Sequence, residues 1–318
     1  MHWPVEVEAP QRATTRILRR AGIVGLGAAL PPAVIESDTI ASRLGLESGW
    51  IQRRTGIRER RRAAADARVA DLAADAARAA LNDAQLDAAA VDTVLVATLA
   101  PDELTPNAAP QVAHAIGATG AAAMDIGAAC TGFVSGLTLG SALIEAHRAR
   151  NVLVIGAEIL SRFTNPDDRS TAGLFGDGAG AVVLTPRQES VVGSAVLGSD
   201  GVAAPFIIAP RESGFITMDG HETFKRAVAT LASNAVQTAA ANGLELDDID
   251  LFVLHQANGR ILSAVRETLR LAPERVLDVI ANVGNTSAAS IPLALAEARE
   301  RGALPDGARV LLGAVGAG

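Results

Sequence analysis

Cysteine is almost absent from this chain, which has one such residue, Cys130, among its 318. A single thiol makes no disulfide within the chain and supplies no cysteine-rich metal site, and it fits a reducing, cytoplasmic compartment. No paired ligand spacing occurs among the five histidines, which are His2, His114, His147, His221 and His255. We therefore predict no bound metal.

Excess positive charge and long apolar runs are also missing. The formal net charge is −7 and the pI is near 5.3, which argues against nucleic acid as the main partner. No run reaches the ~18 apolar residues of a membrane span, so we predict no membrane association. The arginines before the apolar stretch 21–30 are arranged as in a secretory signal. A first buried strand explains the same residues and is the interpretation we favour.

What the chain does contain is typical of a layered α/β protein. Hydrophobic residues make up 49% and charged residues 20%, as in soluble globular domains. Apolar, β-rich runs alternate with alanine-rich helical stretches, which favours sheets buried on both faces. We predict strands at 91–98, 151–158, 178–186, 249–256 and 308–315, and helices at 69–83, 131–149, 221–242, 259–270 and 291–301.

A weak internal repeat divides the chain. An alanine-rich helix, an aspartate-containing turn and a strand follow one another at 72–98 and again at 228–256. Cys130 lies 38 residues after Asp92, and Asn285 lies 35 residues after Asp250. Two related halves, 1–186 and 187–318, packed about a pseudo-twofold axis would turn both loop-to-helix junctions toward one cleft. His255 ends the second half's central strand, where α/β sites usually lie.

These three side chains have complementary chemistry. A thiol at a helix N-terminus meets unpaired backbone N–H groups and the helix dipole, which favour the reactive thiolate. Histidine can take the proton, and an asparagine amide can stabilise an oxyanion. Each residue also has a plain structural interpretation: Cys130 as an inert core thiol, His255 as a hydrogen-bonded strand-end residue and Asn285 as a helix cap.

Six ordered motifs resemble those of the β-ketoacyl-acyl-carrier-protein synthase III family. GAACTGF, LHQANGRI and VGNTSAASIPLAL are similar to the family's three active-site motifs. The remaining three are GWIQRRTGIRERR at 49–61, NPDDRSTAGLFGDGAGAVVL at 165–184 and ITMDGHETFKRAV at 216–228. The resemblance covers nearly the whole chain, apart from the N-terminal extension 1–16. It implies the thiolase fold, with two pseudo-symmetric α/β/α halves in five layers, αβαβα.

The resemblance also implies a reaction. Cys130 would accept an acyl group from an acyl-coenzyme A primer. His255 and Asn285 would bind the thioester carbonyl of malonyl-acyl carrier protein while it loses carbon dioxide, and the carbanion would attack the acyl-cysteine. Two neutral donors suit the enolate oxygen formed by decarboxylation. The second oxyanion hole would use the cysteine N–H and an N–H of the loop 313–318.

Matching positions carry over further roles. For coenzyme A, which is a substrate and not a permanently bound cofactor, they imply Trp50, Arg54, Thr55, Arg169 and Asn258. Arg260 would face the carrier protein. The acyl pocket would include Thr105, Leu160, Arg162 and Val315. Homodimer formation is also implied, with Thr105 contributed across the dimer.

The primer is less defined than the reaction. Thr105 and Val315 are smaller than their counterparts in many members, which indicates a roomier primer pocket. Stretches of the chain are also similar to the branch that primes biotin synthesis, so Arg162 is a candidate contact for a carboxylated primer. The family continues through another strand beyond Gly318. The alternatives are an acyltransferase of specialised metabolism that does not decarboxylate, and a non-catalytic scaffold.

Overall fold

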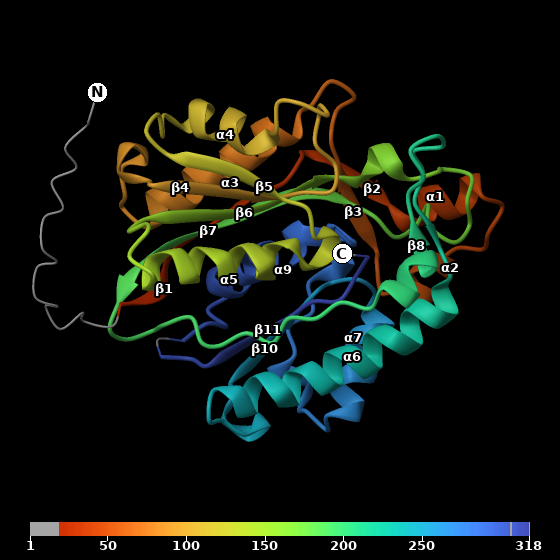
Figure 1. Cartoon of the computed structure of the whole chain (residues 1–318). Helices are drawn as coiled ribbons and strands as arrows, with labels where there is room; N and C mark the ends of the chain where they lie inside the picture. The colour runs from red at the N-terminus through yellow and green to blue at the C-terminus, as the bar shows by residue number, and fades with distance from the viewer. Residues whose placement is uncertain (1–18, 306, 318) are drawn as a thin grey trace, which may run out of the picture.

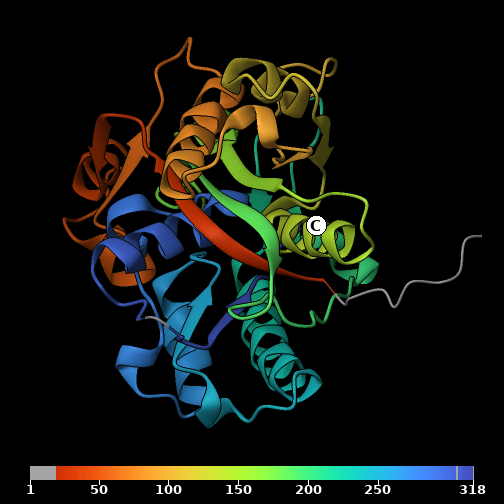
Figure 2. The ribbon, with the colours of Figure 1, turned by 90° about the vertical axis from the view of Figure 1, so that its left-hand side faces the viewer.

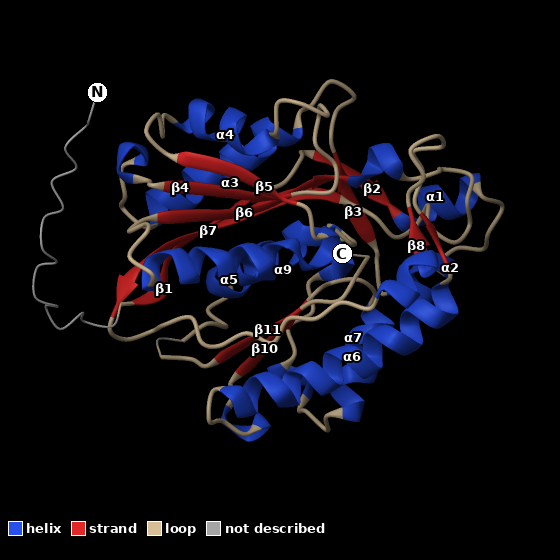
Figure 3. Cartoon of the chain, viewed as in Figure 1, coloured by secondary structure: helices blue, strands red, loops and turns tan. Residues whose placement is uncertain are grey.

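The computed structural model describes residues 19–305 and 307–317, so the predicted extension 1–16 and Gly318 lie outside the described residues. Helices and sheets alternate in five layers (Figures 1 and 3). From one side to the other, these are α3 with α4, a five-stranded sheet, α5 with α9, a two-stranded sheet, and α6 with α7. The predicted αβαβα layering is therefore confirmed.

The larger sheet has the strand order β1-β7-β6-β4-β5. Strand β4 runs parallel to β5 and β6, with Thr93 opposite both Ala122 and Val152, whereas β7 is antiparallel to β6 and β1. Figure 2 shows β1 and β7 lying side by side. The strands are β1 (Arg20–Ala29), β4 (Thr93–Ala97), β5 (Ala122–Ile126), β6 (Val152–Ile159) and β7 (Asp177–Arg187).

Helices α3 (Val69–Asp83) and α4 (Ala108–Ile116) cover the outer face of this sheet, and its inner face packs against α5 (Gly132–Glu145) and α9 (Ser290–Glu300). Alanines let α3 approach β1 closely. A Cβ at Gly25 or Gly27 would lie 2.3 Å from the Ala80 or Ala76 carbonyl oxygen. These two glycines, which are spaced as in a dinucleotide-binding loop, therefore serve helix packing.

The second half repeats this plan on a smaller scale. Strands β10 (Leu251–Leu254) and β11 (Val310–Gly313) are parallel, and a single bridge from Phe252 to Val276 stands where a third strand would lie. Helices α6 (Gly220–Ala241) and α7 (Gly259–Thr268) pack on their outer face. The predicted strands 249–256 and 308–315 are thus shorter than expected.

Matching hydrogen bonds confirm the repeat. The Asp92 N–H donates to Asn151 O at 2.9 Å, and the Asn151 N–H returns a bond to the Asp92 carboxylate at 2.8 Å. Asp250 and Arg309 make the same pair of bonds at 2.9 and 2.7 Å. The first half ends with β7 at Arg187, and the division at 186 and 187 stays a prediction.

Sequence reasoning missed two central elements, β5 and α4. Strand β5 is partly exposed and contains an aspartate, so it lacks the apolar run that marked the other strands. The Asp125 carboxylate accepts hydrogen bonds from the Ala108 and Ala109 N–H groups at 3.0 and 2.7 Å, which caps α4.

Smaller elements lie around one end of the sheet (Figure 1). They are β2 (Ala33–Glu36), β3 (Glu59–Arg62), β8 (Ile207–Ile208), β9 (Thr217–Met218), α1 (Ser37–Arg43), α2 (Trp50–Thr55) and α8 (Ile280–Val283). In the part of the chain that the structure describes, no helix is long and apolar enough to cross a membrane.

Candidate active site

Cys130 lies at a sharp junction between β5 and α5. A 3-10 turn, Ala129–Thr131, precedes the helix, and Ala129 has a φ of 41°, in the left-handed region that few non-glycine residues adopt. The Thr131 hydroxyl donates to Ala128 O at 2.8 Å and holds the turn closed. Cys130 is partly exposed, so the junction presents the only thiol of the chain to a reactant.

Asn285 precedes a second junction of the same kind. Another 3-10 turn, Ser287–Ala289, leads into α9, and Ser287 has a φ of 47°. The Asn285 backbone is bound on both sides, since its N–H donates to Leu174 O at 2.9 Å and its carbonyl accepts from Gly176 N at 3.0 Å. Its Oδ1 accepts the Ser287 N–H at 2.9 Å. The amide nitrogen is therefore the donor left for a substrate oxygen.

His255 follows β10 and is 2% exposed. Its Nδ1 lies 2.6 Å from Ser290 Oγ, which also accepts the Gln256 N–H at 3.3 Å. A serine hydroxyl that accepts from Gln256 has its own proton available for Nδ1, and this favours the tautomer with the proton on Nε2. Burial lowers the pKa of His255 to about 4, so the ring is neutral at physiological pH.

The segment 285–290 unites the three predicted catalytic residues. Ser287 Oγ lies 3.5 Å from Cys130 Sγ, and Ser287 N bonds Asn285. Ser290, one turn further, holds His255. The turn that carries Cys130 and the turn that carries Ser287 also pack against each other. Nucleophile, amide and imidazole therefore belong to one connected group at the centre of the five layers.

The chain end closes one side of the thiol. A Cβ at Gly316 would lie 2.5 Å from Cys130 Cβ and 2.8 Å from its Sγ, so only glycine fits there. The backbone of Ala317 hydrogen-bonds the thiol, as does the N–H of Cys130 itself. Cys130 and Ala317 are the kinds of position expected for the second oxyanion hole, which would use the cysteine N–H and an N–H of the loop 313–318.

Burial opposes the effect of the helix N-terminus on the pKa of Cys130. The helix N-terminus predicts a thiolate, but burial raises the pKa of Cys130 above its ordinary value and outweighs the hydrogen bond from Ser287. The negative charge of Glu158 acts in the same direction. The residue is partly exposed, but its sulfur lies against Gly316 and Ser287, so desolvation of the thiolate outweighs the dipole of the short turn.

Glu158 and Ser287 were not singled out from the sequence. Glu158 is the one acidic residue in the apolar strand β6 and is fully buried. A carboxyl in a buried strand is itself a signal, since such groups are rare without a partner. Ser287 lies inside a recognised motif, but its hydroxyl direction depends on the left-handed backbone at that position.

The residues expected around coenzyme A lie on neighbouring elements. The Arg54 guanidinium stacks 4.5 Å over the Trp50 ring on α2, and Arg169 donates to Leu44 O at 3.3 Å. The Thr55 hydroxyl is buried and donates to Ile51 O at 2.7 Å. The Asn258 side chain caps α7, whose first residue, Gly259, touches Gly56 at the end of α2.

The remaining expected residues are dispersed. Leu160 is fully buried, Val315 packs on the core of the second half, and Thr105 is exposed. Arg162 is already paired, with Asp102 at 3.0 Å and with Ala67 O. Arg260 lies 5.9 Å from the Phe224 ring.

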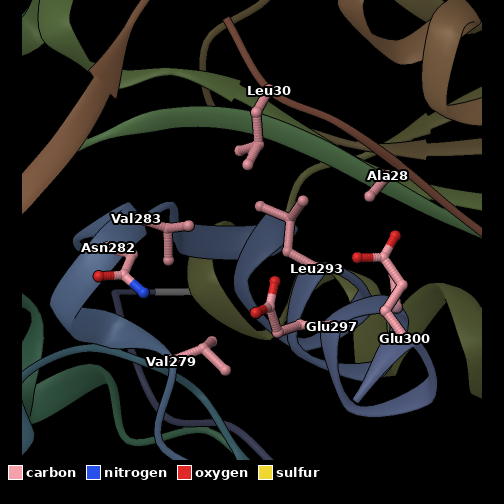
Figure 4. A pocket seen from close by; sticks show the side chains of 9 residues that line it. Ala28, Leu30, Val279, Asn282, Val283, Leu293, Glu297 and Glu300 are labelled. Atoms are coloured by element: carbon pink, nitrogen blue, oxygen red, sulfur yellow. The ribbon is translucent and has the colours of Figure 1, made fainter. Parts of the chain in front are cut away.

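A surface pocket between β1, α8 and α9 is separate from this site (Figure 4). Leu30, Val283 and Leu293 form its apolar part, and the carboxylates of Glu297 and Glu300 its polar part. None of the predicted catalytic or coenzyme A residues lines it.

Comparison with known proteins identifies the class. The model for 3-oxoacyl-[acyl-carrier-protein (ACP)] synthase III matches residues 124–201, and the model for its C terminal matches residues 239–318. The crystal structure of 3-oxoacyl-(acyl carrier protein) synthase III from Pseudomonas aeruginosa superposes with a TM-score of 0.90 at 43% identity, covering 94% of this chain and 95% of that one. The chain is thus an acyltransferase with the thiolase fold.

Sequence relatives narrow the class to a family. Beta-ketoacyl-[acyl-carrier-protein] synthase III 2 of Streptomyces coelicolor is 47% identical over 304 residues, which cover 94% of this chain and 92% of that protein. The 3-oxopimeloyl-[acyl-carrier-protein] synthase of Rhodothermus marinus is 42% identical over 325 residues, covering 97% and 94%. The chain belongs to the β-ketoacyl-acyl-carrier-protein synthase III family.

Proposed function

We propose that this protein condenses an acyl-coenzyme A primer with malonyl-acyl carrier protein and releases carbon dioxide. The observation that carries the proposal is the contact of Cys130 with the segment that holds both Asn285 and His255. A nucleophile and two neutral donors in one buried group suit a reaction that forms first an acyl-enzyme and then an enolate.

The first half-reaction is acyl transfer. Cys130 Sγ attacks the thioester carbonyl of the primer, and the bond to the coenzyme A sulfur breaks as the tetrahedral intermediate collapses. The backbone N–H groups of Cys130 and Ala317, both hydrogen-bonded to the thiol, are placed to receive the oxyanion. Trp50, Arg54 and Arg169 would bind the adenine end, and no permanently bound cofactor is needed.

The second half-reaction is condensation. The malonyl carboxylate leaves as carbon dioxide, and its electron pair forms an enolate whose oxygen accepts hydrogen bonds from His255 Nε2 and the Asn285 amide. The enolate carbon attacks the acyl carbonyl and expels the Cys130 thiolate. The neutral state of His255 supports this role. With a pKa of about 4 the imidazole ring stays neutral, and it can donate its Nε2 proton in a hydrogen bond without giving that proton up.

Acylation is tested with a panel of acyl-coenzyme A primers, short, branched, longer and carboxylated. Intact-mass analysis before and after protease digestion measures the acyl group on Cys130. We expect an adduct with at least one primer and none in Cys130→Ala. If no primer forms an adduct with Cys130, the proposal is wrong. A preference for a carboxylated primer would favour the role of Arg162 and the activity named for the Rhodothermus relative.

The division of labour is tested with His255→Ala and Asn285→Ala. Loss of one oxyanion donor lowers the rate of such a step by about 10²- to 10³-fold. We expect that loss in carbon dioxide release from malonyl-acyl carrier protein, with acylation of Cys130 retained. Equal loss in both half-reactions would contradict separate roles. An adduct formed without any carbon dioxide release in the parent would instead favour acyl transfer to another acceptor.

A homodimer completes the proposal, and β5 supports it. This strand ends the larger sheet, and Met124 on it is 40% exposed, whereas β4 beside it is entirely buried. Pairing of β5 with its copy in a second subunit would remove an open edge. Sedimentation should give a dimer, and Met124→Arg should shift it toward monomer. Arg260 would face the carrier protein, and the compartment would be the cytoplasm.

A further inference from the structure

A buried carboxyl beside the nucleophile has no part in the reaction described above. Glu158 is 0% exposed and lies near the end of β6. Its carboxyl accepts the Thr98 hydroxyl at 3.2 Å and the Leu99 N–H at 3.2 and 3.3 Å. The backbone of Ala288 also hydrogen-bonds it. No described arginine, lysine or histidine pairs with it in an ion pair.

Ser287 connects this carboxyl to the thiol. Its Oγ lies 3.5 Å from Cys130 Sγ, and its hydroxyl also interacts with the Glu158 carboxyl, whose pKa it lowers. Ser287 has a left-handed backbone, with φ of 47°, at the start of its 3-10 turn, and its side chain interacts with both groups. The Ser287 hydroxyl donates to the sulfur at rest. Turned toward Glu158, it can accept the thiol proton while it donates its own, and the three side chains then form a path from sulfur to carboxyl.

We infer that Cys130 passes its proton through the Ser287 hydroxyl to the Glu158 carboxylate during acylation and recovers it during condensation. This inference rests on the proposed acylation of Cys130 and adds its proton acceptor. The thiol proton moves to Ser287 Oγ as the Ser287 proton moves to Glu158, and the sulfur electron pair forms the bond to the acyl carbon. The departing coenzyme A thiolate takes a proton from solvent.

Condensation then reverses the transfer. The Cys130 thiolate expelled from the acyl-enzyme receives a proton from Ser287, which is replenished from Glu158. The carboxyl returns to its ionised form, and one solvent proton has been consumed for each carbon dioxide released. The cycle therefore balances without any metal, oxidant or further base.

The surroundings favour Glu158 as acceptor. Burial raises the pKa of Glu158 to about 8, closer to that of a thiol, and proton transfer is most efficient between matched groups. His255 is engaged through Nδ1 by Ser290, and among the described hydrogen bonds none joins its ring to Cys130. On β7, the Asp177 carboxylate accepts from Ala63 and Ser161. The charge of Glu158, in turn, raises the pKa of Cys130.

The test is the single-turnover rate of Cys130 acylation by a primer that labels the parent, followed by intact mass from about pH 6 to pH 9. We expect Glu158→Gln and Ser287→Ala each to lose about 10²-fold near neutral pH, as for removal of a general base. The parent rate should level off above about pH 8, whereas the variants should keep rising as the thiol ionises. The double variant should lose no more than either single variant.

Thr98→Val is the matched control, because its hydroxyl bonds Glu158 at 3.2 Å but is not on the path to sulfur. We expect it to lose less than about tenfold. A parental rate and pH profile in Glu158→Gln, multiplied losses in the double variant, or an equal loss in Thr98→Val would each overturn the relay. If Glu158→Gln does not fold, the Ser287→Ala profile decides alone. Failure of the parent to acylate would instead refute the proposed function.

Discussion

The two junctions at the centre of the molecule share a backbone and differ in chemistry. Each begins with a left-handed residue, Ala129 or Ser287, continues as a 3-10 turn and enters a long buried helix. The second position of the turn holds Cys130 in one half and Ala288 in the other. The first junction carries Cys130, the proposed nucleophile, and the second carries the side chains that contact it and bind Asn285 and His255. The two junctions therefore have the same backbone geometry and different side chains.

Burial separates the junctions as well. Cys130 is partly exposed, whereas Ala288 is 1% exposed and its carbonyl oxygen would lie 2.2 Å from a Cβ at Gly156. A reactant can therefore reach the first turn, while the second is enclosed by β6. This difference in exposure predicts that a cysteine at the position of Ala288 would not react, although that position is equivalent to Cys130 in the repeat.

Exchanging the nucleophile between the junctions is the strongest test of this comparison. In Cys130→Ala with Ala288→Cys, we expect acylation to stay at least about 10³-fold below the parent, because the moved thiol is enclosed. Intact-mass labelling with the preferred primer measures it, with Ala288→Cys alone as control. Acylation of the transplanted cysteine would show that the two junctions are functionally equivalent.

The buried titratable groups of the two halves have opposite effects on stability. His255, with pKa about 4 against 6.5 when exposed, contributes stability above pH 6.5 that is lost as pH falls through 4. Glu158, with pKa about 8 against 4.5, contributes stability below pH 4.5 that is lost as pH rises through 8. The effect is on the order of 3 kcal/mol for His255 and on the order of 5 kcal/mol for Glu158.

Urea unfolding at about pH 5, 7 and 9 measures both effects. We expect Glu158→Gln to reduce the alkaline decline, and His255→Asn to reduce the acid decline. Variants whose free energy of unfolding runs parallel to that of the parent at every pH would contradict the assignment of these groups.

Gly316 links the second half to the nucleophile of the first. Gly316→Ala forces a Cβ to within 2.8 Å of the Cys130 sulfur, which should displace the loop at a cost of about 1–3 kcal/mol and slow acylation. Gly120→Ala is the control, because nothing lies within 4 Å of a Cβ there. Acylation rates and thermal unfolding report the difference, and equal rates in both variants would mean that the loop yields freely.

The smallest expected effect compares the repeated aspartates. Asp92→Ala removes the acceptor of the Arg150 and Asn151 N–H groups, and Asp250→Ala removes that of the Arg309 N–H. Because both sites are exposed, we expect each to lose about 0.5–1.5 kcal/mol. Similar losses in urea unfolding would support equivalence of the two strand pairs. A loss confined to Asp92→Ala would show that the larger sheet alone depends on this contact.

Sequence patterns predicted the central elements well. The helix at 69–83 has the expected bounds, and β4, β6 and β7 lie within about a residue or two of theirs because they are apolar and buried. Strand β5 was missed since its alternating exposure and Asp125 obscure the pattern. In the second half, Val276 forms only an isolated bridge to Phe252. Whether such a segment becomes a strand depends on its pairing in the folded protein, which the hydrophobic pattern of the sequence does not show.

The site was predicted in part. Spacing and motifs indicated Cys130, His255 and Asn285, and the structure joins them to the segment 285–290. The sequence did not indicate Ser287 and Glu158. Ser287 has a left-handed backbone, and its interaction with Glu158 joins residues that lie 129 positions apart in the sequence. The raised pKa of the Cys130 thiol also depends on burial, which the position at a helix N-terminus does not reveal.

The close approach of Gly316 also bears on how synthetic reagents meet Cys130. One flank of the sulfur is covered by backbone and another by the Ser287 hydroxyl. An electrophile must therefore enter along the remaining direction, which restricts its shape before its intrinsic reactivity matters. Selective covalent inhibition of this thiol is thus a question of steric trajectory more than of thiol acidity.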